Sequence, residues 1–429
     1  MSASGSYGRG AAVLSIGIGV TGLVTYAYFA LASHALPKSE YGGITLLWSA
    51  VFIVASVLYR PVEQLLSRTI AERRAQGRTG GRHLRVAATI QLALAGLFAA
   101  VALALRHPLE HGLFNGSAAL YWILIGAVLA YAASYFARGF LAGNRRFGLY
   151  GGLVLMESAC RFMFALAVAV GIAAGQTGVA LGILVAPLVS LVVVPWALGR
   201  RLRAAAPAPA AADPAAADTD LTLAHGAGFA LAVLAIMLSE QTFLNAGPLV
   251  IKATEHGAAA ASALAGFAFN VLLIARAPLQ LFQAVQTSIL PHLTGLRVMG
   301  AADPFRRSVN VTLGAIAAFA GVVALVMAAA GPPLMRLLFG GHFGYPRGGL
   351  VMVSLGMGLY LAAATLNQAA LAQARARQAA TMWAVSAAAF VVFLVLPGFD
   401  DRVLQLAIGY LAAAALLCSL LFALYRRER

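Results

Sequence analysis

The chain has 429 residues, of which 61% are hydrophobic and 10% charged, and its formal net charge is +16. A soluble protein needs about 25% charged residues to cover its surface, so this composition excludes a water-soluble globular enzyme. Uncharged stretches of about 20 residues recur along the sequence, and each can cross a hydrocarbon core of roughly 30 Å as a helix. Because backbone amides inside lipid need internal partners, the sequence predicts an all-α polytopic membrane protein.

The hydropathy pattern predicts about twelve transmembrane helices. They are expected near 11–33, 42–65, 84–105, 118–137, 150–171, 178–198, 225–250, 260–289, 309–330, 349–371, 378–396 and 403–424. The first span contains Ala30-Leu31-Ala32, which resembles a signal-peptide cleavage site. Its apolar run is longer than the hydrophobic region of a signal peptide, so we expect this span to be retained.

One break in composition divides the chain. Residues 200–222, RRLRAAAPAPAAADPAAADTDLT, have few large side chains to bury and are typical of a flexible linker. The sequence therefore predicts an N-terminal six-helix bundle over 1–199 and a C-terminal six-helix bundle over 223–429. An even number of spans in each half gives a parallel pseudo-twofold repeat, which we expect to surround a central cavity.

Short matches between the halves support this repeat. Arg60 and Gln64 recur as Arg276 and Gln280, late in the second and eighth predicted spans. In the same order along the chain, the segment around Arg145 recurs around Arg375, after the fourth and tenth spans. The consistent order of the matches favours an internal duplication.

The distribution of basic residues predicts the orientation. If the amino terminus is cytoplasmic, 21 of the 30 basic residues fall in cytoplasmic segments and six fall in external ones. Arg138 is counted here among the cytoplasmic residues, just after the fourth span. The positive-inside rule then places the chain in the cytoplasmic (inner) membrane with both termini in the cytoplasm. The same rule accounts for the high charge without nucleic acid, and leaves membrane lipids as the partners of these arginines.

The sequence does not favour an enzyme. It contains no nucleotide-binding loop of the GxxxxGK[ST] type. His107-Pro108-Leu109-Glu110-His111 matches an inverted zinc-protease pattern, but Pro108 in a short loop disfavours the helix that this site needs. Cys160 and Cys418 both lie inside predicted spans and are interpreted as small apolar packing residues. We therefore expect no catalytic residues, no metal and no cofactor.

Ionisable side chains inside the spans are the candidates for function, because inserting each costs about 2.5–3.5 kcal/mol. The second span carries Arg60, Glu63 and Gln64, and Arg60 and Glu63 are one turn apart and can pair. The fifth carries Glu157 and Arg161 at i, i+4. These residues predict either a polar, cationic cavity that holds an anionic headgroup, or, in the alternative, a snorkelling arginine and a structural ion pair.

The second half offers a similar set. Arg276, Gln280 and Gln283 share one face of the eighth span and are candidate substrate-binding residues with Arg60, Gln64 and Arg161. Glu240 in the seventh span is either an acid that couples transport to ions or a partner of Arg276. Pro61 and Pro278 are candidate hinges, since proline removes a helix hydrogen bond.

Four segments carry a family resemblance: 36–77, which begins LPKSEYGG, 138–162 (RGFLAGNRRFGLYGGLVLMESACRF), 269–293 and 337–383. They resemble the polysaccharide-transporter family of the multidrug/oligosaccharidyl-lipid/polysaccharide flippase superfamily. The resemblance implies two six-helix bundles around a cavity, alternating access, and transfer of an undecaprenyl-pyrophosphate-linked oligosaccharide from the inner to the outer leaflet. It also implies cationic cavity positions at Arg60, Arg276 and Arg161, and a glycan polymerase or glycosyltransferases as partners.

Two rival functions remain open. A multidrug or cation antiporter of the same fold predicts an acidic cavity, whereas the acidic and basic residues inside the predicted spans balance. A non-transporting scaffold of an envelope-synthesis complex predicts that Arg276 is dispensable. A major-facilitator transporter is disfavoured, because SRTIAERRAQGRTGG lacks the Gly-x-x-x-Asp-Arg pattern of that family.

Overall fold

The computed structural model describes residues 3–76, 81–193, 195, 223–274, 302–341, 344–373 and 375–426. The described residues form helices and contain no strand, as the sequence predicts. The helices are α1 (Ala3–Ala35), α2 (Lys38–Ala75), α3 (Arg82–Ala104), the π-helix η1 (Pro108–Leu113), α4 (Ala118–Gly143), α5 (Phe147–Ala169), α6 (Gly175–Ser190), α8 (Leu223–Thr254), the helix Ala258–Ile274, α10 (Ala302–Phe339), α11 (Arg347–Ala372), α12 (Ala376–Val395) and α13 (Arg402–Arg426).

The helices match the predicted spans in order and type. Within the described ranges, nine helices are long and apolar enough to cross a membrane, and Gly175–Ser190 and Ala258–Ile274 are shorter apolar helices. Several extend beyond their predicted bounds, because charged residues such as Arg138 continue a helix past its apolar stretch. The predicted linker 200–222 and the second part of the eighth span lie outside the described residues.

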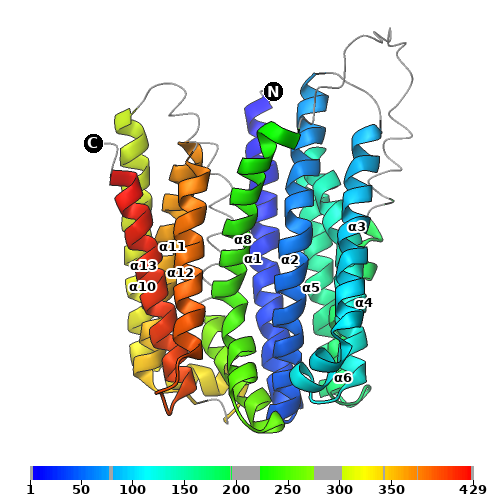
Figure 1. Cartoon of the computed structure of the whole chain (residues 1–429), viewed down its shortest axis with the longest axis vertical. Coiled ribbons are helices and arrows are strands. Elements are labelled where there is room, and N and C mark those ends of the chain that lie inside the picture. Colours follow the sequence, from blue (N-terminus) through cyan, green and yellow to red (C-terminus); the bar gives the residue numbers. More distant parts are fainter. Residues whose placement is uncertain are drawn as a thin grey trace.

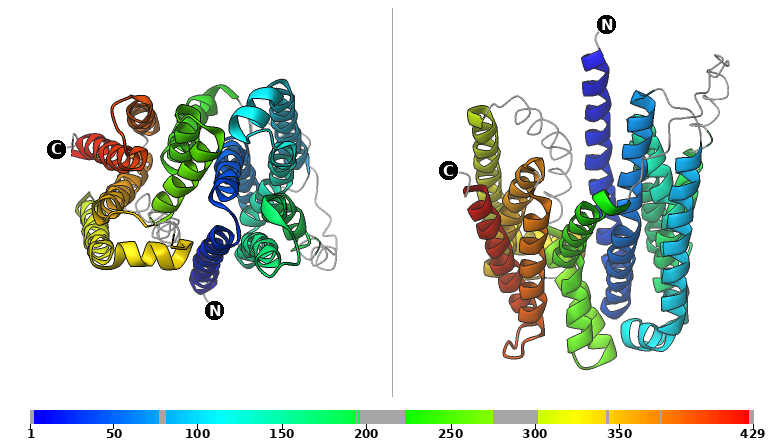
Figure 2. Two further views of the ribbon diagram at one scale, coloured as in Figure 1. Left: turned by 90° about the horizontal axis from the view of Figure 1, so that it is seen from below. Right: turned by 45° about the horizontal axis from the view of Figure 1, so that its top comes forward.

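The helices form two bundles of six with matching internal packing (Figure 1). In the first bundle, α1 packs on α5, α4 packs on α6, and α5 packs on α6. In the second bundle, α8 packs on α12, α11 packs on α13, and α12 packs on α13. In both bundles, therefore, the first helix packs on the fifth, the fourth on the sixth, and the fifth on the sixth. This correspondence confirms the parallel repeat. The view from below in Figure 2 (left) shows the two groups side by side.

The two turns that match in sequence also occupy equivalent places in the two bundles. Arg145 follows α4 and Arg375 precedes α12, so each stands between the fourth and fifth helices of its bundle. The backbone N–H of Arg375 donates to the Ala370 carbonyl at 2.9 Å, and that of Arg146 donates to the Leu141 carbonyl at 2.9 Å. Both turns therefore close the preceding helix through its final carbonyl groups.

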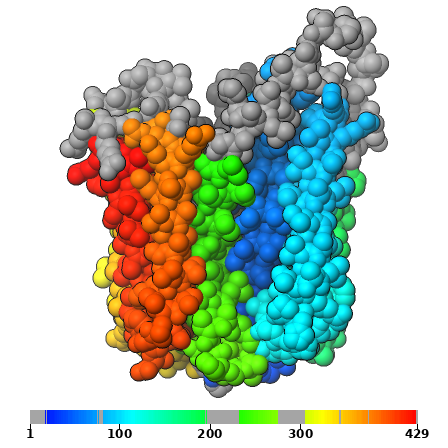
Figure 3. Space-filling model, in the orientation of Figure 1, coloured from blue at the N-terminus to red at the C-terminus, as the bar shows by residue number. Residues whose placement is uncertain are grey.

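Both chain termini lie at one end of the molecule, and the bundles meet closely towards the other, which we call the distal end (Figure 1). There α2 crosses the helix Ala258–Ile274 with backbone against backbone. A Cβ atom at Gly42 would lie 1.9 Å from the carbonyl oxygen of Ser262, and one at Gly266 would lie 3.0 Å from the Gly42 Cα. Glycine is therefore required at this crossing. Figure 3 shows α8 filling the space between α12 and the first bundle on one face.

Polar contacts hold the distal end together. Lys252 is buried and donates to Asn115 Oδ1 at 2.5 Å, and Asn115 Nδ2 donates to Ser262 Oγ at 3.0 Å. Nearer the middle, the Tyr41 hydroxyl donates to Asn270 Oδ1. Each of these contacts joins the first bundle to the second, so together with the glycine crossing they form a seal between the bundles.

An aromatic cluster positions α8 within the second bundle. The ring of Phe243 lies 5.5 Å from Phe390 in a stacked arrangement and 5.8 Å from Tyr360. The rings of Trp383 and Tyr410 lie 6.0 Å and 6.3 Å from it. Aromatic pairs at such distances add about 0.5–1.5 kcal/mol each to the burial of their surface. The cluster fixes the side of α8 that also carries Glu240, one turn before Phe243.

Candidate functional site

A polar face runs along α2 from the middle of the bundle to the end where the termini lie. Arg60, Gln64 and Arg68 follow one another at one-turn intervals and therefore share this face. Gln64 is exposed, and the Arg60 side chain is 36% exposed. Charged side chains are costly against lipid, which favours a position facing a water-accessible space.

Arg60 forms an ion pair with the opposite bundle. Its Nη1 atom lies 3.9 Å from Glu240 Oε2 on α8. The sequence suggests pairing with Glu63, but in the structure the ion pair joins α2 to α8. Among the described residues, the cationic partner of Glu240 is Arg60; the predicted alternatives, ion coupling or pairing with Arg276, stay predictions, since Arg276 lies outside the described residues. The Glu240 side chain is 24% exposed, so both members of the pair are partly accessible.

Pro61 follows Arg60 without interrupting the helix. α2 runs as one helix from Lys38 to Ala75 through this proline. The role of Pro61 as a hinge stays a prediction.

Glu63 points to the interior of the first bundle. Its Oε1 atom accepts a hydrogen bond from the Tyr150 hydroxyl of α5 at 3.0 Å. α4 also approaches α2 closely here, since a Cβ at Gly139 would lie 2.8 Å from the Glu63 carbonyl oxygen. Arg138, next to that glycine, is thereby brought into the same interior as Glu63.

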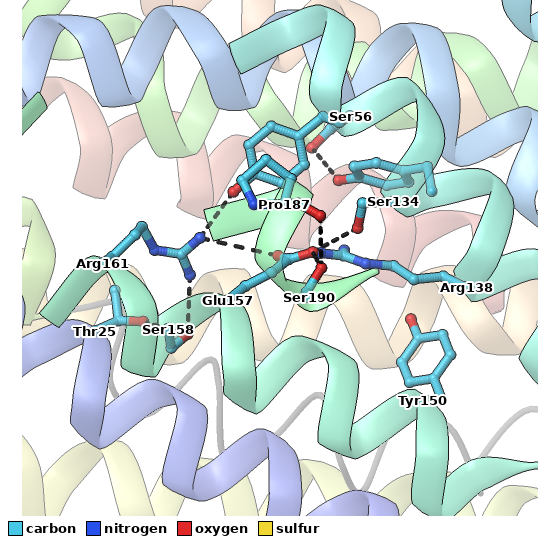
Figure 4. A network of polar contacts seen from close by, with 12 residues as sticks. Thr25, Ser56, Ser134, Arg138, Tyr150, Glu157, Ser158, Arg161, Pro187 and Ser190 are labelled. Atoms are coloured by element: carbon cyan, nitrogen blue, oxygen red, sulfur yellow. Dashed lines mark hydrogen bonds and ion pairs between the residues drawn. The ribbon is translucent and has the colours of Figure 1, made fainter. Parts of the chain in front are cut away.

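Glu157 is the centre of a buried polar network (Figure 4). Its Oε2 atom lies 2.5 Å from Arg138 Nη2 and 3.9 Å from Arg161 Nη1. Its Oε1 atom accepts hydrogen bonds from the Ser134 hydroxyl at 2.5 Å and the Ser190 hydroxyl at 3.4 Å. Two cations and two hydroxyl donors from three helices therefore hold one carboxylate. Such an acid has little capacity to bind a further cation.

Arg138 is the member of this network that the sequence analysis misplaced. It was assigned to a cytoplasmic segment because the apolar stretch ends at Ala137. In the structure α4 continues to Gly143, and the Arg138 side chain is 11% exposed and bound to Glu157. A usable signal was present: Arg138 is one turn after Ser134, so both point into the bundle from one helix face.

Arg161 is also held inside the first bundle, through its two terminal nitrogen atoms. It donates to the Tyr131 hydroxyl at 2.8 Å and to the Ser158 hydroxyl at 2.9 Å. Its guanidinium lies 5.2 Å from the centre of the Trp48 ring, within range of a cation–π interaction. The side chain is 4% exposed. The predicted Glu157–Arg161 pair is present, and its place fits a structural role better than direct contact with a substrate.

The charges along the first bundle alternate in sign. Arg60 and Glu63 of α2, Arg138 of α4, and Glu157 and Arg161 of α5 follow one another through its interior. Three arginines face two glutamates, which leaves one positive charge in excess. Glu240, from the other bundle, supplies the balancing charge at the accessible end of the series.

The remaining predicted residues of the second bundle, Arg276, Pro278, Gln280 and Gln283, lie outside the described residues. Near them, Asn270 is buried at the contact with Tyr41. On α8, Asn245 donates to Gln241 Oε1 at 2.9 Å within the bundle.

Comparisons with known proteins identify the fold. No family model matches the chain, and no curated protein matches it in sequence. Among solved structures, a mutant of the Vibrio cholerae MATE transporter VcmN is similar with a TM-score of 0.63 at 18% identity, over 99% of this chain and 98% of that one.

Structures of a multidrug resistance MATE transporter of the MOP superfamily are also similar. The outward-facing form has a TM-score of 0.61 at 14% identity, over 98% of this chain and 95% of that one. The inward-facing form has a TM-score of 0.57 at 14% identity, over 100% of this chain and 95% of that one. The chain therefore has the fold of MATE transporters, with twelve helices in two bundles, as the sequence predicts.

Proposed function

We propose that this chain, which has the fold of MATE transporters, moves an amphiphile with an anionic headgroup across the membrane by alternating access. The fold supplies two bundles that can rock against each other. The bundles contact one another at a distal seal, and they also meet through one accessible ion pair, Arg60–Glu240. A carrier needs a seal on one side of its site, and this arrangement supports such a role.

The ion pairs of the acidic side chains inside the helices support the choice of substrate. Of the carboxylates inside the described membrane-spanning helices, Glu157 is held by two arginines and Glu240 by one. Glu63 accepts from Tyr150 and lies in the same interior as Arg138. A carrier of organic cations needs an acid that is free to bind them. Within the described helices, the accessible cation of this site is Arg60, whose planar guanidinium suits phosphate oxygens when Glu240 leaves it.

A lipid-linked glycan is the substrate that best fits these features. An undecaprenyl-pyrophosphate headgroup is anionic and bulky, and its polyprenyl tail can stay in the bilayer while the headgroup crosses. The polar face of α2 offers Arg60 and Gln64 to such a headgroup. With the termini in the cytoplasm, the distal seal would be external, and the substrate would enter from the inner leaflet.

The second candidate is a multidrug or cation antiporter. The structural neighbours favour it, because those with a stated role are multidrug resistance MATE transporters. A shared fold hosts different substrates, so the neighbours leave the choice to the residues of the site. In this alternative Glu240 would leave Arg60 to bind a cation.

A transport assay with both substrate classes separates the candidates. Purified protein in proteoliposomes is given a fluorescent undecaprenyl-pyrophosphate-linked sugar or a cationic dye, and appearance in the opposite leaflet or lumen is measured. We expect transport of the lipid-linked sugar and a loss of about tenfold or more in Arg60→Ala, because a hydrogen bond to a charged group contributes about 1.5–3 kcal/mol.

Arg68→Ala is the matched control. It removes the same charge from the same face of α2, but Arg68 is 72% exposed and pairs with Glu72 at 2.6 Å. We expect its transport rate to stay within about twofold of the wild type, since exposed pairs contribute about 0–1 kcal/mol. Transport of the dye alone, unaffected by Arg60→Ala, would support the antiporter instead.

A further inference from the structure

The Arg60–Glu240 pair is more exposed than the ion pairs around Glu157 in the first bundle. Its two charged groups are 3.9 Å apart, with exposed fractions of 36% and 24%. The Arg138–Glu157 pair, by contrast, is 2.5 Å long, with exposed fractions of 11% and 2%. The Arg161–Glu157 pair is also 3.9 Å long, but its side chains are 4% and 2% exposed, so exposure is what sets Arg60–Glu240 apart. An exposed pair is loosely held where water reaches it, because water screens the attraction and competes for both groups.

Glu240 also has a second neighbour inside its own bundle. Tyr360 on α11 is buried and interacts electrostatically with the Glu240 carboxylate, and its hydroxyl has no hydrogen-bond partner among the described residues. Tyr360 is fixed by the aromatic cluster around Phe243. When Arg60 takes another partner, the unpartnered Tyr360 hydroxyl is therefore a polar neighbour for Glu240 in the second bundle.

We propose that Glu240 is a specificity-determining residue that occupies Arg60 in the empty carrier and is displaced from it by the anionic headgroup. This inference rests on the proposed function and deepens it. The Glu240 carboxylate is held beside Arg60 by its own helix. It therefore competes with any free anion for the Arg60 guanidinium at a high effective concentration. Only a group with more charge or more acceptor oxygens than a carboxylate displaces it efficiently. A pyrophosphate meets this condition better than a monophosphate does.

The exchange also links binding to movement. The pair joins α2 of one bundle to α8 of the other. When a headgroup replaces Glu240 on Arg60, this connection between the bundles is lost at the accessible end of the site. Binding of the substrate thus removes an ionic contact that favours the empty arrangement, which is how a ligand shifts a two-state equilibrium.

Glu240→Gln tests the exchange with two defined probes. Full-length protein in nanodiscs is titrated with undecaprenyl pyrophosphate and with undecaprenyl phosphate, and dissociation constants are measured for wild type, Glu240→Gln and Arg60→Ala. We expect Glu240→Gln to bind both lipids more tightly, by about three- to tenfold, because the competing charge is gone. We expect the gain to be larger for the monophosphate, so that the preference for pyrophosphate falls.

Glu255→Gln is the control. It removes an equal charge just after α8 ends, but Glu255 pairs with Arg402 of its own bundle at 2.7 Å, near the distal end. Its lipid affinities should equal those of the wild type. Melting temperatures of all variants show whether each is folded.

The outcomes separate the two proposals. If Arg60→Ala abolishes binding while Glu240→Gln leaves both affinities unchanged or weakens them, the exchange is wrong and the proposed anion site stands. If wild type binds neither lipid, or Arg60→Ala binds both as the wild type does, the proposed function itself fails. An affinity gain in Glu255→Gln equal to that of Glu240→Gln would reduce the effect to net charge and overturn the exchange.

Discussion

Removing the carboxylate of Glu157 should destabilise the first bundle strongly. Glu157→Ala leaves Arg138 and Arg161 without their shared anion in a region where their side chains are 11% and 4% exposed. Breaking a buried ion pair by removing one partner costs about 3–5 kcal/mol. The Ser134 hydroxyl, which donates to Glu157 at 2.5 Å, also loses its acceptor, so we expect the upper part of this range.

The assay is thermal unfolding in detergent micelles, followed by near-UV circular dichroism. At roughly 2 °C per kcal/mol, the scale for large domains, a loss of about 4 kcal/mol lowers the melting temperature by about 8 °C. Glu72→Ala is the control, because it breaks an exposed pair with Arg68 and should cost under about 1 kcal/mol. Equal melting temperatures for Glu157→Ala and Glu72→Ala would refute the view that this network stabilises the bundle.

Three further changes test the distal seal and the interior of the first bundle. Gly42→Leu should open the seal, because even a Cβ there lies 1.9 Å from a facing carbonyl oxygen. Increased labelling of a cysteine introduced at the distal end, by an impermeant maleimide, would show it, and unchanged labelling would contradict it. Lys252→Met should weaken the seal less, since it removes the 2.5 Å contact with Asn115 but no backbone contact; the same labelling should rise less than in Gly42→Leu. Tyr150→Phe should cost about 1 kcal/mol through the lost hydrogen bond to Glu63, seen as a small fall in melting temperature, and a fall as large as that of Glu157→Ala would be unexpected.

The sequence predicted the architecture well because the membrane restricts the possibilities. Long apolar runs in lipid form helices, and their even division predicts two parallel bundles. The turns at Arg145 and Arg375 illustrate this division: a few repeated residues mark equivalent places in the two bundles. Helix ends were less accurate, because hydropathy detects the apolar stretch and α2 and α4 continue past it.

Spacing along one helix predicts contacts within that helix better than contacts between bundles. Local spacing gave the Glu157–Arg161 pair, which is present. It also suggested Arg60–Glu63, whereas Arg60 instead reaches Glu240 on a helix far along the chain. Pairing between bundles depends on how they pack, and one sequence does not encode that in its spacing. Arg138 was missed for a related reason, since a residue at the end of an apolar run can point inwards or to solvent.

The most direct test of the central claim, that an accessible arginine between the bundles grips an anionic headgroup, is protection of a cysteine at position 64. Gln64 is exposed on the Arg60 face of α2, one turn away. In a Cys160→Ala/Cys418→Ala background, labelling of Gln64→Cys by an impermeant maleimide is measured with undecaprenyl pyrophosphate or with a cationic dye. The account predicts labelling in the empty protein and protection by the lipid pyrophosphate. Protection by the dye alone, or labelling that neither compound changes, would contradict it.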